Sequence, residues 1–157
     1  NFLTEHGISS YGELESKLTA VSARRDTAHA EIKRIESRSA ELALVMKHAG
    51  TYRQLKPLYE RYRKSNDKEK FLRGHESEII LFEAAARELK RLGAVPLPTT
   101  ESMKTELATL SAEKERLLAE YKTARTEAQE YDTVKQNVDA LLTVPKEQEQ
   151  QRRHELE

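Results

Sequence analysis

The chain has 157 residues, of which 34% are charged, and its formal net charge is zero. It contains no Cys and no Trp, which excludes disulfide frameworks and thiolate chemistry and fits a reducing compartment. Gly and Pro are scarce, a composition that favours long helices over sheet. No apolar run approaches the roughly 20 residues that a bilayer requires, so we expect a cytoplasmic protein without membrane spans.

Residues 1–10 are predicted to be a short lead-in segment that docks on the helices through its apolar side chains. Ser10 and Glu13 have the spacing of a capping box, in which each side chain satisfies a free backbone N–H. The first long helix is therefore expected to begin at Tyr11. Because the chain begins at Asn1 without a Met, we expect it to be a piece of a longer protein.

A seven-residue apolar repeat predicts that residues 11–49 form one helical arm. The repeat alternates steps of four and three, the spacing that places a narrow apolar stripe along one face of a helix. Gly50 is expected to end this arm. The stripe consists of Leu14, Leu18, Val21, Arg25, Ala28, Ile32, Ile35, Ser39, Leu42, Met46 and Ala49.

A second stripe of the same kind predicts another arm at residues 101–143. Thr99 or Thr100 is the expected N-cap, and the arm should end before Pro145. Residues 144–157 are rich in Glu and Gln, and we expect a polar, disordered tail there. The second stripe consists of Met103, Leu107, Leu110, Lys114, Leu117, Tyr121, Ala124, Ala128, Tyr131, Lys135, Val138 and Leu142.

Residues 50–100 separate the two arms and are too many for a simple turn, so we predict a small helical cap. Three short helices are expected within this cap, at residues 55–63, 68–72 and 75–92. Pro57 should lie in the first turn of the first helix or kink it. Gly93 should end the third helix.

Together these elements predict an all-α fold, a long antiparallel coiled-coil hairpin with a small helical cap inserted between its two arms. Placing Ala49 beside Met103 brings apolar positions together along the whole register. The same register puts Arg25 near Glu127, where an ion pair could form. A monomeric hairpin is favoured, and a dimeric coiled coil remains the alternative because it would bury the same stripes.

The sequence shows no arrangement typical of an active site. Its five histidines are scattered, and none has the neighbours that a metal site requires. Glycine-rich phosphate loops and serine nucleophile elbows are absent from the sequence. We therefore predict that this chain is not an enzyme and holds no metal or cofactor.

The predicted cap contains a cluster of basic residues interleaved with aromatic ones. Residues 51–73 hold eight Lys or Arg and three Asp or Glu, a net charge of 8 − 3 = +5. Such a segment can neutralise phosphates, and tyrosines can stack on bases. The alternative interpretation is that the aromatic rings form a core while the charges only face water. The candidate DNA-binding residues are Arg53, Lys56, Arg61, Arg63, Lys64, Lys68, Lys70 and Arg73.

Several segments resemble the region after the catalytic domain in relaxases of conjugative transposons from Gram-positive gut bacteria. These proteins are the mobilisation nucleases that nick and pilot the transferred DNA strand. The similar segments are Leu3-Thr4-Glu5-His6-Gly7-Ile8, Tyr59-Glu60-Arg61-Tyr62-Arg63-Lys64, Phe71 with His75 and Glu78-Ile79, Ala119-Glu120-Tyr121-Lys122, Ala124-Arg125, and Asn137-Val138-Asp139.

The resemblance implies a non-catalytic C-terminal region that aids DNA binding or assembly with relaxosome or transfer-machinery proteins. Relaxase catalysis uses a tyrosine nucleophile and a metal held by a histidine cluster, and nothing in this sequence matches that cluster. Pro57 departs from the plainly helical stretch expected in relatives. The alternative function is a purely structural coiled-coil spacer or dimerisation module without nucleic-acid contact.

Overall fold

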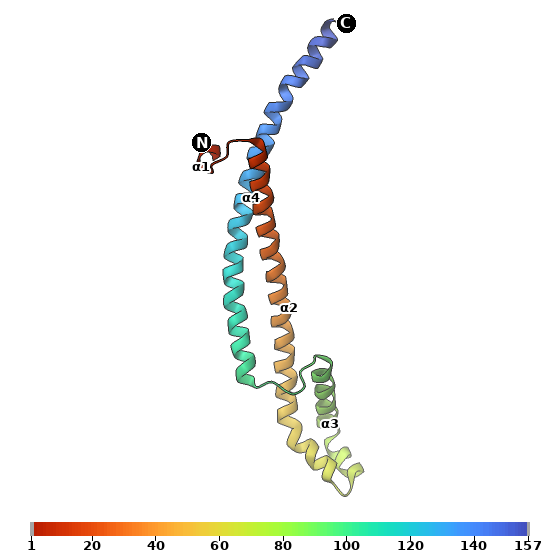
Figure 1. Cartoon of the computed structure of the whole chain (residues 1–157). Coiled ribbons are helices and arrows are strands. Elements are labelled where there is room, and N and C mark those ends of the chain that lie inside the picture. Colours follow the sequence, from red (N-terminus) through yellow and green to blue (C-terminus); the bar gives the residue numbers. More distant parts are fainter. Residues whose placement is uncertain (1, 157) are drawn as a thin grey trace. The chain divides into compact units, whose positions relative to one another are not determined.

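The computed structural model describes the backbone of residues 2–156 and the side chains of residues 2–142. Its elements are α1 (Phe2–Glu5), α2 (Tyr11–Lys64), α3 (Lys68–Arg91) and α4 (Thr100–Leu156), shown in Figure 1. No strand occurs in residues 2–156, which confirms the predicted all-α class. The chain divides into two compact units: a first unit of residues 1–32 and 115–157, and a second unit of residues 33–114.

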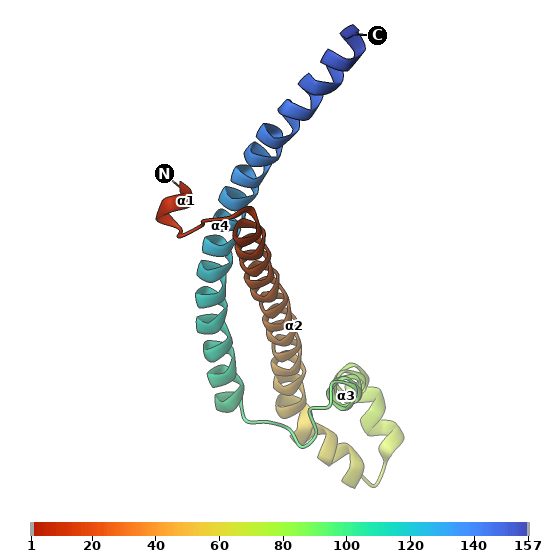
Figure 2. The same cartoon turned by 45° about the horizontal axis from the view of Figure 1, so that its top comes forward.

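In the first unit, α2 and α4 lie side by side and run antiparallel (Figures 1 and 2). The Tyr11 hydroxyl donates to Asp139 Oδ1 at 2.6 Å, and Arg24 Nη1 lies 3.8 Å from Glu127 Oε2. The contact nearer the start of α2 thus involves the later residue of α4, which is the pairing that antiparallel helices have. Donation to Asp139 stabilises the neutral phenol and raises the pKa of Tyr11 to about 12.

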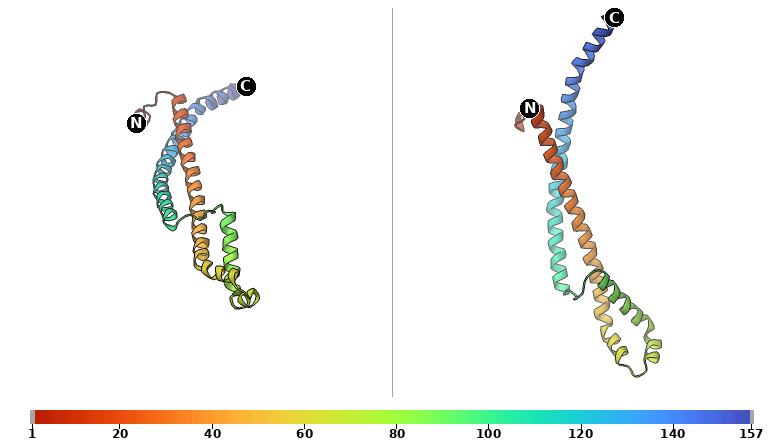
Figure 3. Two further views of the ribbon diagram at one scale, coloured as in Figure 1. Left: turned by 60° about the horizontal axis from the view of Figure 1, so that its bottom comes forward. Right: turned by 45° about the vertical axis from the view of Figure 1, so that its right-hand side comes forward.

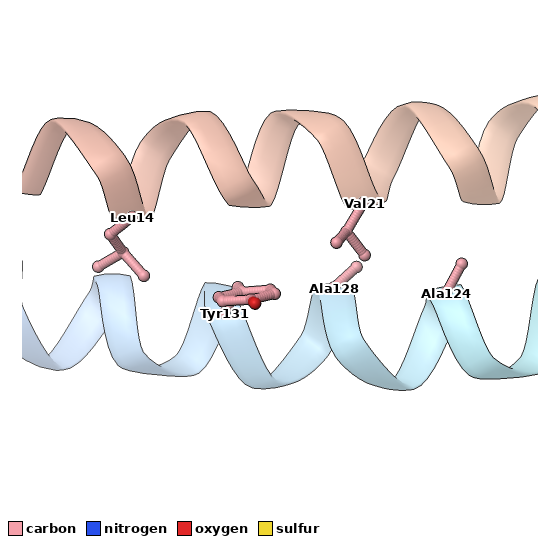
Figure 4. Packing of buried hydrophobic residues seen from close by; sticks show 5 residues of the cluster. All are labelled: Leu14, Val21, Ala124, Ala128 and Tyr131. Atoms are coloured by element: carbon pink, nitrogen blue, oxygen red, sulfur yellow. The ribbon is translucent and has the colours of Figure 1, made fainter. Parts of the chain in front are cut away.

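The core of the first unit is built from the predicted stripes. Leu14 and Val21 of α2 face Ala124, Ala128 and Tyr131 of α4 in Figure 4, and each is at most 7% exposed. Small alanines opposite larger side chains let the two helices approach closely. The predicted neighbours Val21 and Tyr131 both belong to this cluster, as the antiparallel register requires.

Two rings of the lead-in segment pack against Tyr131 of α4. The ring centroids of Phe2 and His6 lie 5.3 Å and 5.5 Å from that of Tyr131. One half of the predicted capping box forms, because Ser10 Oγ accepts from the Glu13 N–H at 3.2 Å. The Glu13 carboxylate reaches back to the N–H of Ser9 at 2.8 Å, and this bond lowers the pKa of Glu13.

The predicted ion pair between Arg25 and Glu127 is wrong. Arg25 Nε lies 3.0 Å from Oδ1 of its neighbour Asp26, whereas Arg24 is the residue that faces Glu127. Asp26 is next to Arg25 in the sequence, so the guanidinium reaches its carboxylate without crossing from α2 to α4. The local pair therefore forms instead.

In the second unit, charged pairs flank the contact between α2 and α4. Arg38 donates to both carboxylate oxygens of Glu106, at 2.8 Å and 3.2 Å. Lys114 Nζ lies 3.7 Å from Glu36 Oε1, so the helices are antiparallel here as well. The bidentate bond to Arg38 lowers the pKa of the Glu106 carboxyl.

Burial follows the seven-residue repeat in both long helices. Every stripe residue is buried or half-buried with the exception of Leu142, which is 60% exposed. Ile35 is fully buried and Leu117 is 6% exposed, as predicted for core residues. The polar stripe residue Arg25 is half-buried, with its charged end paired to Asp26.

The predicted end of the first arm at residue 49 is wrong, because α2 continues through Gly50 and Pro57 to Lys64. Gly50 does not take the positive φ with which a glycine ends a helix; only Gly7 and Gly93 do. The helix predicted at residues 55–63 is therefore the last part of α2. This part, yellow in Figure 1, turns away from the preceding turns, as expected for a helix with an internal proline.

The helices predicted at residues 68–72 and 75–92 are one element, α3, with a break at His75. His75 has φ −135° and ψ 26°, outside the helical region. Its Nδ1 is buried without a hydrogen-bond partner, and the nearest carboxylate oxygen, Glu78 Oε2, lies 3.8 Å away. Gly93, with φ +70°, follows the end of α3 as predicted.

The predicted boundary between an arm at 101–143 and a disordered tail at 144–157 is also wrong, because α4 continues to Leu156. The residues after Pro145 are mainly Glu, Gln and Arg, which have good helix propensity. At the other end, Thr99 Oγ1 accepts from the Ser102 N–H at 3.1 Å, which confirms Thr99 as the cap. Glu157 lies outside the described residues.

We predict that Ile35→Ala lowers the free energy of unfolding by about 2–4 kcal/mol, because it leaves a cavity at a fully buried position. Urea denaturation followed by circular dichroism measures the change. Ile80→Ala is the matched control; its side chain is 54% exposed, so a change within about 0.5 kcal/mol is expected. Equal effects of the two substitutions would show that the stripe is not buried at Ile35.

Candidate nucleic-acid interface

A tight turn joins α2 to α3 (Figure 3). Basic residues of both helices flank this turn in the sequence. The Ser65 N–H donates to the Tyr62 carbonyl at 3.2 Å, and the Asp67 N–H donates to Ser65 Oγ at 3.2 Å. Asp67 then caps α3, because its Oδ1 accepts from the Lys70 N–H at 3.1 Å. The chain thereby reverses within three residues, and the last turn of α2 meets the first turns of α3.

All eight candidate basic residues are exposed, but they do not form one set. The side chains of five of them, around the turn, make no hydrogen bond, ion pair or ring contact with any residue in the part of the chain that the structure describes. We call these five residues the basic tip: Arg63, Lys64, Lys68, Lys70 and Arg73.

The other three candidates have structural contacts. Arg53 donates to Thr100 Oγ1 at 2.7 Å and to the Pro98 carbonyl at 2.6 Å, so it anchors the loop before α4. Lys56 Nζ lies 5.8 Å from the Tyr52 ring centroid, a cation–π distance. Arg53, a predicted DNA-binding residue, thus has a structural role as well, because the loop carbonyl and hydroxyl accept hydrogen bonds from its guanidinium.

Arg61 makes a structural contact and is also exposed to water. Its guanidinium carbon lies 5.7 Å from the centroid of the Phe71 ring, which ties the end of α2 to the start of α3. The cation is nevertheless exposed, so it adds positive charge beside the basic tip.

The aromatic residues of this region are occupied by one another. The Phe82 ring is stacked with Tyr52 on centroids 4.8 Å apart and with Tyr59 on centroids 4.3 Å apart. Near the turn, Tyr62 and Phe71 have centroids 6.0 Å apart. The rings thus form the core between α2 and α3, as the alternative interpretation of the sequence held, while the charges lie outside it.

Two further cations lie on α3, beyond the basic run of residues 51–73. Arg87 and Lys90 are exposed and line hollows beside α2, together with the carboxylate of Glu83. They fall outside the basic run in sequence, and the packing of α3 on α2 brings Arg87 beside Lys56. No sequence signal marks this proximity.

Comparisons of this chain with protein-family models, with curated proteins and with solved structures found no significant match. Among the described residues, no three or more His, Asp or Glu side chains are grouped so that they could hold a metal ion. No helix in the described part of the chain is both long and apolar enough to cross a membrane.

We predict that Asp67→Ala lowers the free energy of unfolding by about 1 kcal/mol, because it removes the cap of α3. Asn66→Ala is the control; Asn66 is exposed and next in sequence, and its side chain makes no contact among the described residues. Chemical denaturation of both variants measures the difference. Equal stability of the two variants would mean that the turn is not held by this cap.

Proposed function

We propose that this chain is a non-catalytic helical region of a DNA-mobilisation relaxase, and that it contacts DNA through phosphate groups at the basic tip. The observation that carries the proposal is the set of five exposed cations around the turn between α2 and α3, none of which has a partner among the described residues. The relaxase parentage rests on the sequence resemblance alone. Assembly with relaxosome or transfer-machinery proteins is part of the same proposal.

Phosphates suit the basic tip better than base edges do. Lys and Arg carry their charges on long flexible side chains, so at the end of a helix pair they can neutralise phosphates without a fixed geometry. Base readout needs side chains held by a surrounding framework, and the five cations of the tip have no such contacts. The neighbouring tyrosine and phenylalanine rings pack on one another, which leaves electrostatic attraction as the main source of affinity.

Binding of this kind should depend steeply on salt. We predict that the chain binds DNA with modest affinity, with a log–log slope of about −0.9 per phosphate neutralised on duplex DNA or about −0.7 on single strands. Fluorescence anisotropy with labelled oligonucleotides across a salt series measures the slope. If the chain does not bind at low salt, the purely structural spacer or dimerisation module becomes the better reading.

Reversing charges at the tip should reduce both the affinity and the salt slope. The variant Lys64→Glu/Lys68→Glu/Arg73→Glu changes three tip cations that make no side-chain contacts among the described residues, so the helix content should stay unchanged. Arg61 is left intact because it also contacts Phe71. We expect binding to fall by at least about tenfold, with the slope on duplex DNA reduced by about 0.9 for each contact removed.

A matched control has the same change in net charge away from the tip. Lys47, Lys104 and Lys122 are exposed and make no ion pair among the described residues, so the variant with all three changed to Glu isolates the effect of position. It should bind DNA more tightly than the tip variant. Equal losses in the two variants would indicate a response to net charge only and would remove the tip as the contact.

A further inference from the structure

Two adjoining hollows lie along the contact between α2 and α3 in the second unit. The charged hollow, about 460 Å³ in volume, is lined by Lys56, Arg63 and Arg87 together with two carboxylates. The apolar hollow, about 440 Å³, lies at the end of α3 and is lined mainly by aliphatic side chains. Tyr52 and Ala86 line both hollows, so the two form one continuous surface. Each volume is in the range of known ligand sites.

The apolar hollow is suited to bind one large apolar side chain of a partner. Leu89 and Ala94 are buried, while Val95 is 68% exposed. The loop that forms its outer wall is held in place, because Arg53 donates to the Pro98 carbonyl at 2.6 Å. An exposed Val on a fixed loop beside a buried Leu leaves apolar area in water that a partner's side chain would cover.

The charged hollow has an excess of cations that are available to a partner. Neither Arg63 nor Arg87 forms an ion pair with the two carboxylates of the hollow, Glu60 and Glu83. Lys90, on the rim of the apolar hollow, adds a further cation. Over both hollows, four cations face two carboxylates, so the surface carries a net charge of 4 − 2 = +2.

We propose that this surface docks an acidic peptide segment of a partner protein, with a large apolar side chain in the apolar hollow and a carboxylate over Lys56 and Arg87. Charge complementarity determines the acidic character of the segment, and the aliphatic lining determines the apolar anchor. The proposal does not rest on DNA binding at the tip. The two surfaces use different side chains, apart from Arg63.

The spacing along α2 sets the spacing within the partner. Tyr52, at the border of the hollows, and Lys56, in the charged hollow, are four residues apart, or about 6 Å along the helix. A helical segment with its apolar anchor and its acidic residue three or four positions apart would reach both at once. This is the helix-in-groove mode of recognition, in which an amphipathic helix places its apolar face in a hydrophobic groove.

Nucleic acid fits this surface poorly. The Phe82 ring is covered by Tyr52 and Tyr59, and Lys56 lies over the Tyr52 ring, so little aromatic face remains for a base to stack on. Glu60 and Glu83 would repel a phosphate backbone that runs along the whole charged hollow, whereas a single carboxylate can lie over Lys56 and Arg87 without following the hollow past them. The apolar hollow, moreover, has no partner for a phosphate other than Lys90.

The probe for the test is a fluorescein-labelled helical peptide of twelve residues, with leucine and glutamate placed four positions apart in an alanine-rich background. Two control peptides replace either the glutamates by lysine or the leucines by alanine. Anisotropy with the whole chain should show binding of the first peptide, and each control should bind at least about tenfold more weakly. Equal binding of all three peptides would overturn the proposal.

Protein variants locate the contact and separate it from the tip. Lys56→Glu/Arg87→Glu should weaken peptide binding by at least about tenfold, whereas Lys68→Glu/Lys70→Glu at the basic tip should leave it unchanged. DNA binding should show the opposite pattern, so failure of either proposal can be distinguished from failure of the other. Thermal melts confirm that both variants fold, and Val95→Glu tests the apolar hollow independently of Lys56 and Arg87.

The opposite results would refute the docking proposal. If Val95→Glu and Lys56→Glu/Arg87→Glu both bind the peptide as the parent does, the hollows are not its site. If Lys56→Glu/Arg87→Glu weakens binding of an oligonucleotide as much as it weakens binding of the peptide, the surface is a nucleic-acid site instead. If the parent does not bind the peptide at low salt, the surface does not dock a segment of this chemistry.

Discussion

Burial of one narrow apolar stripe on each long helix is the constraint on which both units depend. Ile35 and Ala124 are fully buried, and the stripes hold nearly all the large apolar side chains of α2 and α4 that are shielded from water. A helix that is polar over the rest of its surface cannot keep its place alone, because helices in water are stabilised mainly by packing of an apolar face. The flanking bond of Arg38 to Glu106 lies half-exposed and adds alignment more than stability.

The stripe does not account for α3, which depends on a different contact. Phe82, only 6% exposed, is stacked between Tyr52 and Tyr59 of α2, and this ring stack fixes α3 along the end of α2. The positions of the cations follow from it. With Phe82 inside, Arg87 falls beside Lys56 in the charged hollow, while the Asp67 turn places Lys64 and Lys68 at the basic tip.

The sequence predicted the features that follow from side-chain periodicity and missed those that depend on the backbone's response to Gly and Pro. Fold class, the buried stripes and the Thr99 cap were confirmed, since each reflects a local pattern of apolar or capping residues. Gly50 was predicted to end the first arm, and Pro57 to lie in the first turn of a separate short helix or to kink it, yet one helix, α2, passes through both, because packing on both sides of them outweighs the propensity cost of about 1 kcal/mol for Gly and about 3 kcal/mol for Pro. The hollows were not predictable, since they join residues about thirty positions apart.

The separation of charge from apolar surface in the second unit argues for two partners and not one. The basic tip consists of five exposed cations, whereas the apolar hollow has Lys90 as the single cation in its lining. Under the two proposals, a polyanion would gain from the first surface, whereas a segment with one carboxylate and an apolar anchor would use both hollows at once. Arg63 belongs to the basic tip and also lines the charged hollow, so two anionic partners would compete for it. The two proposed sites would therefore be coupled through this one side chain, while the remaining cations keep the two surfaces chemically distinct.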